Sequence, residues 1–551
     1  MDAPVSGPVT GTTGAQGQPA ATGFLGWVER TGNRLPDPVL LFVWFILVLV
    51  AISVAASLAG WSARHPGELD PATGLGRIVA VESLLSTQNL RRLLTQVPET
   101  FTHFAPLGMV LTVMLGAGVA ERSGLFAAAM QASIAKAPPA LLTHAVAFAC
   151  MMANHAADAA FVVMIPLAAI IYHAAGRHPL VGIGVSFASV SGAFSANLTP
   201  GQLDALLLGI TEEAVQTVFG DYTVNIAGNW YFIAAMLCAY LPVIWYVTDR
   251  VVEPRLGPYD PASRSRGAAD DPKASPADDA VPATSASERR GLLHAGIAIA
   301  ALALVWTALT LAPGAPLTDP AAPPQGRLNP LYQSLLPFFL LVFLVPGYLY
   351  GRAAGTIGDH RDLITMMAAG MKDMAYYLVL TFVAAHFVAM FAWSNMGIVL
   401  AVNGADALKA SGLPEWAMLV TILIFGAALN LIIGSASAKW AVLAPILVPM
   451  LMLVGISPEM TTAAYRVGDS ATNIITPLMV YFPLVLIFCQ RWNARFGLGS
   501  LTAMMMPYFV GIMLAGLAVT VAWAVLDLPL GPGVSVYLET LPGPGTPSSR
   551  N

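Results

Sequence analysis

Residues 430–483 read NLIIGSASAKWAVLAPILVPMLMLVGISPEMTTAAYRVGDSATNIITPLMVYFP, and this stretch decides how the chain must fold. It is apolar enough to lie in a lipid bilayer, yet it contains Lys439, Arg466 and Asp469 among small hydroxyl residues. A charged side chain at membrane depth is costly unless it is paired or hydrated, so such residues commonly mark a functional site. The stretch therefore predicts an integral membrane protein with a polar site among its helices.

The composition of the whole chain agrees with a membrane location. Of its 551 residues, 56% are hydrophobic and 10% are charged, whereas a soluble protein has about 25% charged residues. Several windows of ~20 residues are apolar enough to span a bilayer, which predicts an all-α polytopic membrane protein. The net charge of −5 comes mostly from loops and indicates no nucleic-acid partner. The three cysteines lack paired spacing, so no disulfide framework, metal centre or cofactor is predicted.

A hydrophilic loop divides the chain into two halves. Residues 250–290 carry seven Lys and Arg side chains among Pro, Ala, Ser and Asp, which predicts a disordered cytoplasmic loop by the positive-inside rule. The full division is a disordered N-terminal tail (1–25), a first transmembrane half (26–249), this loop (250–290), a second transmembrane half (291–527) and a C-terminal tail (528–551). Each half is expected to contain one re-entrant helical hairpin.

The apolar segments predict about nine membrane crossings. They lie near 39–59, 105–121, 139–153, 229–249, 291–312, 334–351, 375–400, 416–433 and 503–526. The mixed-charge residues 61–104 are expected to form an extracytoplasmic loop, and the amphipathic piece 359–374 is expected to lie at the cytoplasmic interface.

Proline spacing indicates an inverted repeat. Pro166 and Pro179 are thirteen residues apart in the first half, and so are Pro445 and Pro458 in the second. Other side chains have matching offsets in the two halves. Asp158 and Ser437 lie eight residues before the first proline, and Phe161 and Trp440 lie five residues before it. Thr199 and Thr476 each directly precede a later proline. Matching Gly/Pro-interrupted segments in two halves are the best sequence pointer to a secondary transporter with its binding site between the repeats.

The interrupted segments also have the wrong length for simple spans. Residues 441–456 are sixteen residues, or about 24 Å of helix, against a ~30 Å hydrocarbon core. We therefore expect GSASAKW to turn inside the membrane as the tip of a re-entrant hairpin, and DSATNIITP to break the later helix at Pro477. MANHAAD (152–158) and FSANLTP (194–200) are expected to do the same in the first half. Such backbone must be buried in protein or line an aqueous cavity.

The interrupted segments are rich in side chains with oxygen atoms, which as ligands suit Na⁺ better than a transition metal. The first-half set is Asn154, Asp158, Ser195 and Asn197, and the second-half set is Ser435, Ser437, Thr472 and Asn473. The predicted Na⁺ sites are at Asn154, Asp158 and Asn197, and at Ser435 and Asn473. The alternative is that these side chains hold transmembrane helices together by hydrogen bonds, which is their usual role.

The charged residues suggest how an anion is bound. Arg466 and Asp469 are three residues apart, so they share a helix face and are expected to pair. A carboxylate substrate would exchange into the Arg466 fork and leave Asp469 to take a proton; the alternative is a structural ion pair. Asp204 follows the first-half break and is a second candidate for titration during transport, or else a loop-end residue without a role.

Two further residues near the hairpin tip have alternative interpretations. Trp440 is placed to stack on an aromatic ring of the substrate or to anchor the chain at the membrane interface. Lys439 is expected to extend to the surface. The lone histidines His155 and His386 are expected to be packed rather than functional.

At these residues the sequence resembles the aminobenzoyl-glutamate transporter (AbgT) family of the ion-transporter superfamily. The matching pieces are GNRLPDP (32–38), FAPLGMVLTVMLGAGVAERSGL (104–125), GSASAKWAVLAPILVPML and AYRVGDSATNIITP. The resemblance implies a homodimer in the bacterial inner membrane, with nine transmembrane helices and two hairpins per protomer. It implies transport of p-aminobenzoyl-glutamate, or of p-aminobenzoate and its sulfonamide mimics. By motif, the important positions of the family fall on Ser437, Trp440, Pro458, Arg466, Asp469 and Pro477, and less closely on Asp204, because NLTPGQLD departs from the pattern.

The sequence thus predicts a transporter of small aromatic carboxylates coupled to Na⁺ or protons, with the direction of transport open. A transporter of another small carboxylate and an ion channel remain alternatives. An intramembrane enzyme is a third class, but neither HExxH nor GxSxG occurs, so no enzymatic activity is predicted.

Overall fold

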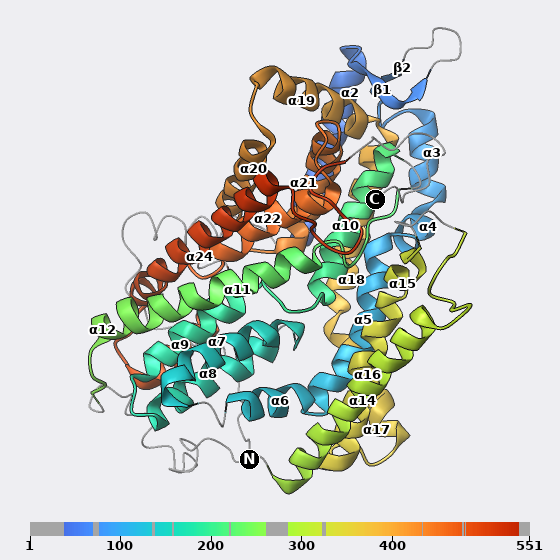
Figure 1. The fold of residues 1–551 in the computed structure, drawn as a ribbon. Coiled ribbons are helices and arrows are strands. Elements are labelled where there is room, and N and C mark those ends of the chain that lie inside the picture. Colours follow the sequence, from blue (N-terminus) through green and yellow to red (C-terminus); the bar gives the residue numbers. More distant parts are fainter. Residues whose placement is uncertain are drawn as a thin grey trace, which may run out of the picture.

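The chain folds mainly into α-helices, with one small two-stranded sheet at one end (Figure 1). The computed structural model describes residues 38–69, 76–134, 138–156, 159–219, 222–260, 285–321, 327–431, 434–476, 479 and 481–538. The predicted N-terminal tail (1–25), Asp158 and Pro477 lie outside these residues.

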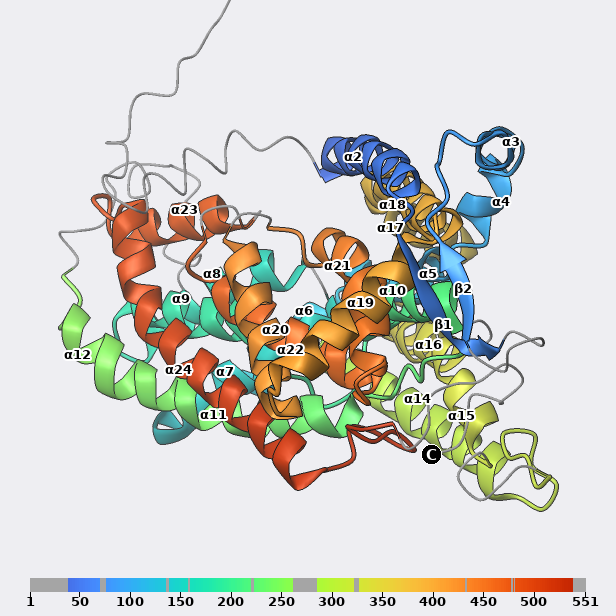
Figure 2. The same cartoon turned by 90° about the horizontal axis from the view of Figure 1, so that it is seen from above.

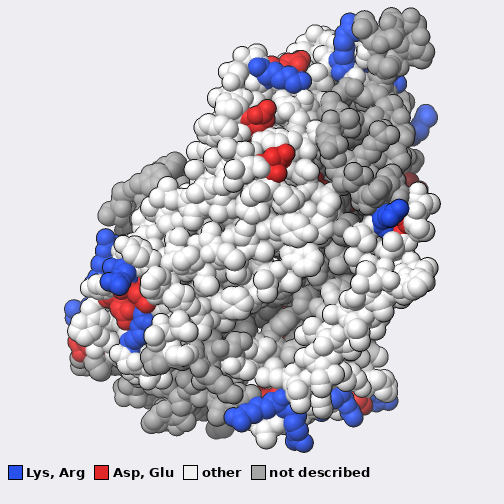
Figure 3. All heavy atoms as spheres, in the orientation of Figure 1, with Lys and Arg blue, Asp and Glu red and all other residues white. Residues whose placement is uncertain are grey.

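Six of the described helices are long and apolar enough to cross a membrane. They are α2 (Pro38–Leu58), α11 (Trp230–Val247, continued in helical form to Leu256), α14 (Ala286–Leu311), α16 (Leu335–Ala354), α18 (Ala375–Trp393) and α24 (Leu498–Leu526). On the face drawn in Figure 3, Lys, Arg, Asp and Glu gather toward the ends of the molecule and leave a broad band between them without charge. The protein is therefore a multi-pass membrane protein.

One group of helices packs with very close backbone contacts. In it, α5 (Ala105–Arg122) lies beside α16, and α14 and α17 (His360–Asp373) complete the group (Figure 1). A Cβ atom at Gly116 would lie 2.3 Å from the carbonyl oxygen of Leu340. Small residues allow membrane helices to approach at this distance, where lipid provides no hydrophobic drive for association.

The segment 61–104, expected as a loop, contains regular structure. Strands β1 (Ser62–Leu69) and β2 (Gly76–Ala80) pair antiparallel, with Ser62 opposite Ala80. Two short helices follow, α3 (Thr87–Thr95) and α4 (Val97–Thr102). Ser86 caps α3 by accepting a hydrogen bond from the Asn89 amide, which stabilises the first turn.

A series of short helices follows in each half of the chain. The first comprises α7 (Leu142–Met152), the single turn η2 (Ala153–Ala156), α8 (Ala159–Ala174), α9 (Pro179–Phe187) continued by η3 (Ala188–Gly192), and α10 (Gln202–Phe219). The second comprises α20 (Glu415–Asn430), α21 (Ala436–Met452), α22 (Pro458–Thr472) and α23 (Phe482–Trp492). Each series is followed by a long helix, α11 or α24, and these two pack side by side (Figures 1 and 2).

The prolines that suggested a repeat occupy matching places in these series. Pro166 lies inside α8 and Pro445 inside α21. Pro179 and Pro458 are the first residues of α9 and α22, where the missing amide hydrogen of proline costs no helical hydrogen bond.

The segment 375–400, predicted as one span, is divided between α18 and α19 (Met396–Ser411). Asn395 lies between the two helices with a left-handed φ of 58°, a conformation that asparagine tolerates better than most residues. The chain is held there by the sheet, because Asn395 Nδ2 donates to the Ala80 carbonyl and Glu82 N to the Ser394 carbonyl. The prediction of one continuous helix is wrong because these tertiary contacts end it.

Described residues with regular or packed structure extend into both ends of the predicted loop and into the start of the predicted C-terminal tail. Helical structure continues past 249 to Leu256 and resumes at Ala286, while residues 261–284 of the predicted loop lie outside the described residues. Residues 528–538 pack against the turn between α21 and α22, where Ser457 N donates to the Val536 carbonyl and Val536 is fully buried.

Candidate functional site

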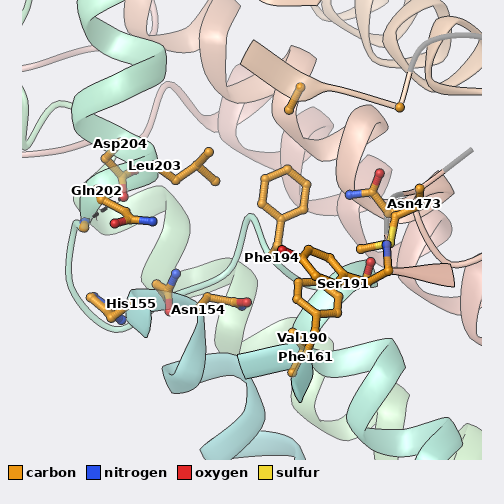
Figure 4. A pocket seen from close by; sticks show the side chains of 16 residues that line it. Asn154, His155, Phe161, Val190, Ser191, Phe194, Gln202, Leu203, Asp204 and Asn473 are labelled. Carbon is orange, nitrogen blue, oxygen red and sulfur yellow. Dashed lines mark hydrogen bonds between the residues drawn. The ribbon is translucent and has the colours of Figure 1, made fainter. Parts of the chain in front are cut away.

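A cavity of about 250 Å³ lies where the two series of short helices meet (Figure 4). The first series contributes Asn154, His155, Phe161, Val190, Ser191, Phe194, Asn197, Gly201, Gln202, Leu203 and Asp204, and the second contributes Gly434, Ala436, Asn473, Met479 and Tyr481. Most of these residues lie at helix ends or interruptions, where backbone polar groups are free of helical hydrogen bonds. The described tips of the interrupted segments therefore lie around one cavity.

Aromatic rings form part of the wall of this cavity. The rings of Phe161, on α8, and Tyr481, just before α23, stack with centroids 4.5 Å apart and an interplanar angle of 13°. Phe194, which follows η3, also lines the cavity and points into it in Figure 4. Only the position of Phe161 drew attention in the sequence, through its offset from Pro166. Phe194 and Tyr481 carried no signal.

Asp204 lines the cavity at the start of α10 and has two partners. Its Oδ2 accepts a hydrogen bond of 2.9 Å from Gly201 N, as an acidic residue in the first helical turn does in a capping box. Its Oδ1 pairs with Arg466 Nη1. Both side chains are buried, and Arg466 Nε and Nη2 have no hydrogen-bond partner among the described residues. The pair therefore holds unused donors directly behind the cavity wall.

The predicted pairing of Arg466 with Asp469 is wrong. Residues three apart on a helix differ in direction by about 60°, and here each faces a different neighbouring helix. Arg466 meets α10, whereas Asp469 Oδ1 pairs with Lys439 Nζ on α21. Lys439 is 2% exposed, so the prediction that it extends to the surface is also wrong, because its carboxylate partner lies inside the protein.

Trp440 lies outside the cavity. It is completely buried, its ring stacks on Tyr465 with centroids 4.4 Å apart, and its Nε1 donates to Thr211 Oγ1 at 2.9 Å. The interpretation as an interfacial anchor is wrong, because the ring has no exposed surface. In this structure the Trp440 ring does not face the cavity. It connects α21 to α22 through the stack on Tyr465 and to α10 through the hydrogen bond to Thr211.

The predicted oxygen ligands divide into two groups. Asn154 and Asn197 line the cavity, and Asn154 Nδ2 and Asn197 Oδ1 have no partner among the described residues. Ser195 instead hydrogen-bonds to Ser470, Oγ to Oγ at 2.9 Å. In the first half the structure therefore brings Asn154, Asn197 and Asp204 around one cavity.

In the second half, most predicted oxygens are already hydrogen-bonded. Ser435 Oγ caps α21 by accepting from Ala438 N at 3.3 Å. Thr472 Oγ1 and Asn473 Oδ1 both accept from Asn430 Nδ2. Asn473 still lines the cavity, whereas Ser437 lines a separate, smaller one. The described residues contain no cluster of three or more His, Cys, Asp and Glu that would hold a metal ion.

Two other residues differ in their placement from the sequence expectation. Pro458 begins α22 directly after the Ser457 cap and is not among the residues that line the cavity. His155, expected to be packed, lines the cavity and lies 3.1 Å from Thr199 Oγ1 through its Nε2. The available signal was that this histidine lies in MANHAAD, a segment that the sequence predicts to interrupt the helix.

Comparisons with known proteins found a matching family model and a similar relative. Residues 23–538 match the model of the AbgT putative transporter family. The chain is 36% identical over 513 residues to the p-aminobenzoyl-glutamate transport protein of Escherichia coli (strain K12), covering 92% of this chain and 96% of that one.

Two solved structures are also similar. The Alcanivorax borkumensis YdaH transporter, described as having an unusual topology, matches with a TM-score of 0.80 at 40% identity, over 90% of this chain and 100% of that one. Neisseria gonorrhoeae MtrF, described as illuminating a class of antimetabolite efflux pumps, matches with a TM-score of 0.84 at 40% identity, over 93% of this chain and all of that one.

Proposed function

The chain belongs to the AbgT transporter family and is not an enzyme, and on this premise we propose that it is a cation-coupled secondary transporter of p-aminobenzoyl-glutamate and p-aminobenzoate-type anions. The observation that carries the proposal is the cavity between the two series of short helices, which has aromatic rings in its wall and the Asp204–Arg466 pair at its side. An aromatic carboxylate needs both features, one for its ring and one for its charge.

The architecture behind this function is nine transmembrane helices, two re-entrant hairpins and an inverted repeat. In this proposal the hairpins are α7–α8 and α20–α21, so the segments 139–153 and 416–433, counted as crossings from the sequence, become hairpin arms. The broken helices α9–α10 and α22–α23 take their places as crossings. Support comes from the matching prolines and from the length of α21, which at seventeen residues spans about 26 Å. Alternating access would then move one repeat relative to the other around the cavity.

The aromatic ring of the substrate contacts Phe161, Phe194 and Tyr481. These rings line the cavity, whereas Trp440 is covered by Tyr465 and bonded to Thr211. Trp440 therefore acts indirectly, by fixing the position of the tip that carries Gly434 and Ala436. Ser437 and Pro458 contribute in the same way, through the geometry of α21 and the start of α22.

The carboxylate of the substrate is bound by Arg466. In this structure one nitrogen of the guanidinium contacts Asp204 and the other two lack partners among the described residues. A second carboxylate can bind the guanidinium of Arg466 without displacing Asp204 completely. Hydrogen bonds to the remaining donors stabilise a buried guanidinium. Asp204 and Asp469 are the coupling carboxylates of this proposal.

A coupling cation is proposed near the first-half tip. Asn154 and Asn197 approach the cavity from η2 and from the segment after η3, and the Asn197 Oδ1 is an unused acceptor. Ser195 and Asp158 are the further ligands of this proposal. In the second half the predicted oxygens, Ser435, Thr472 and Asn473, take part in hydrogen bonds within the protein, so Na⁺ would have to displace these bonds to bind there.

The remaining parts of the proposal concern location and direction. We assign the chain to the bacterial inner membrane as a homodimer, acting as an importer of the glutamate conjugate or as an antiporter that exports p-aminobenzoate and sulfonamide antimetabolites. The E. coli relative carries the name of a transport protein for the conjugate, and MtrF is described with efflux pumps. The same contacts serve both directions, because a carrier follows the dominant gradient.

Flux measurements test the proposal. Labelled p-aminobenzoyl-glutamate and p-aminobenzoate are measured in right-side-out and inside-out vesicles, with Na⁺ and proton gradients imposed separately. We expect saturable, temperature-dependent accumulation that unlabelled sulfonamide inhibits. Flux that does not saturate would favour a channel, competition by simple carboxylates alone would favour another substrate class, and no movement of either compound would contradict the proposal.

A further inference from the structure

Lys439 is a buried cation in an unfavourable place. Its side chain has no exposed surface, although lysine normally extends its ammonium group to water. It is the fourth residue of α21, near the positive end of the helix dipole, where a cation is further destabilised. A position that is unfavourable in both respects needs a compensating interaction, and commonly has a role.

The ammonium group is compensated by oxygen atoms from two other helices. Lys439 Nζ contacts Asp469 Oδ1 on α22 and Asn430 Oδ1 at the end of α20. Hydroxyl, amide and carboxylate oxygens are the ligands that a transporter offers to a small hard cation. Lys439 therefore occupies the centre of what would otherwise be a cation site.

Asn430 is held in the orientation that this arrangement needs. Three acceptors surround its Nδ2: the Asp469 carbonyl at 2.7 Å, Thr472 Oγ1 at 2.9 Å and Asn473 Oδ1 at 2.7 Å. The amide nitrogen must face these acceptors, so the amide oxygen faces Lys439. Asn473 lines the cavity, and the ammonium group is thus two hydrogen bonds away from it.

The groups that act on this ammonium are few. Asp469 pairs with it, and the Tyr465 hydroxyl lies 3.4 Å from Asp469 Oδ1. Other charged or titratable groups on the helices beside α21 are bonded to other residues: Asp204 with Arg466, Glu212 with Gln216, Glu459 with the Asn225 amide, and His386 with the Phe382 carbonyl. Glu213 on α10 and Tyr377 on α18 are half-buried, and Asp406 and Lys409 on α19 are exposed. Asp469 Oδ2 has no partner among the described residues.

We propose that the Lys439 ammonium fills the cation position of the second half and that transport is coupled to the loss and return of its proton, an inference that rests on the transport function proposed above. With Nζ protonated, Asp469 is neutralised and α20, α21 and α22 are held together. When the helices separate and water reaches Nζ, the ammonium gives its proton to that water; the Asp469 carboxylate then lacks a counter-ion, and this disfavours return to the closed arrangement until Nζ is protonated again. One proton is released on one side and rebound from the other in each cycle.

Purified full-length protein tests the cation position without any substrate. Lys439→Ala should leave an oxygen-lined vacancy that Na⁺ can fill, so its melting temperature in detergent should rise in NaCl relative to choline chloride by more than that of the wild type. Lys409→Ala, which removes an exposed lysine, is the matched control and should behave like the wild type. If Lys439→Ala gains no additional response to Na⁺, the assignment of the cation position is contradicted.

Proteoliposomes test the coupling. Under an imposed pH gradient without Na⁺, the wild type and Lys409→Ala should accumulate labelled p-aminobenzoate, whereas Lys439→Ala should accumulate at least about tenfold less yet still exchange it. Lys439→Gln, which can donate a hydrogen bond to Asp469 but has no proton to release, controls for folding and should behave like Lys439→Ala. Wild-type accumulation in either Lys439 variant overturns the coupling role. If the wild type moves no substrate under any gradient, the transport function fails, and the melting experiment still decides the cation position.

Discussion

Arg466 on α22 donates from Nη1 to Asp204 Oδ1 on α10, across 262 positions of sequence, and both side chains are buried. This bond joins the two series of short helices beside the cavity. It also determines which free donors can meet an anion, because Arg466 Nε and Nη2 have no partner among the described residues. In the transport function proposed above, the substrate carboxylate would share this guanidinium with Asp204.

Arg466→Ala should abolish anion transport and lower the stability of the protein. Removing one partner of a buried ion pair leaves an uncompensated charge, at a cost of about 3–5 kcal/mol. The double variant Arg466→Ala with Asp204→Asn should recover most of this stability, because asparagine can still accept the Gly201 amide bond, but should not recover transport. Melting temperature and vesicle uptake measure the two effects. Equal stability of the single and double variants would contradict the pairing.

Phe161→Ala and Tyr481→Ala should weaken binding of aromatic substrates. A stacked aromatic pair contributes about 0.5–1.5 kcal/mol beyond its buried area, so KM should rise by about 2- to 10-fold, with a smaller effect for Tyr481→Phe. Phe101→Leu, which changes an aromatic pair with Phe382 that does not line the cavity, is the control. An unchanged KM in both cavity variants would show that the ring of the substrate lies elsewhere.

Trp440→Ala should lower the stability of the protein more than it changes the selectivity for substrate. Deleting a fully buried large aromatic side chain costs about 3–5 kcal/mol, and here the stack on Tyr465 and the bond to Thr211 are lost as well. Trp440→Phe keeps a ring against Tyr465, so we expect near-normal KM for p-aminobenzoate with a lower melting temperature. If Trp440→Phe instead raised KM strongly at unchanged stability, direct contact of Trp440 with the substrate would be indicated.

Asn197→Leu should reduce the response of transport to Na⁺ if the first-half tip holds the cation. The substitution removes the unpartnered Oδ1 of a residue that lines the cavity and keeps a side chain with the same number and branching of heavy atoms. The Na⁺ concentration for half-maximal uptake should increase, while uptake driven by a pH gradient alone should change little. Ser437→Ala, on a residue that lines a different cavity, is the comparison. The same Na⁺ dependence in Asn197→Leu and the wild type would remove Asn197 from the site.

Much of the candidate site was visible in the sequence as positions but not as contacts. The sequence indicated where helices would be interrupted, since proline and glycine act through the local backbone. It also indicated, through the charges of the second half, that a polar site lies there. The partner of Arg466 was predicted wrongly, because spacing within α22 gives the direction of each side chain only relative to its own helix. That helix packs against α20, α21, α24 and α10, and α10, which carries the Asp204 partner, comes from the other half of the chain.

The sequence by itself determined a helical membrane protein with interrupted apolar segments, because hydrophobicity, proline and glycine act through the bilayer and the local backbone. Only the tertiary structure decided that Lys439 pairs with Asp469, that Arg466 pairs with Asp204, and that Phe161 and Tyr481 rather than Trp440 line the cavity. A buried charge must find its counter-ion wherever packing provides one. That place depends on how the two halves are packed together, which no local pattern specifies.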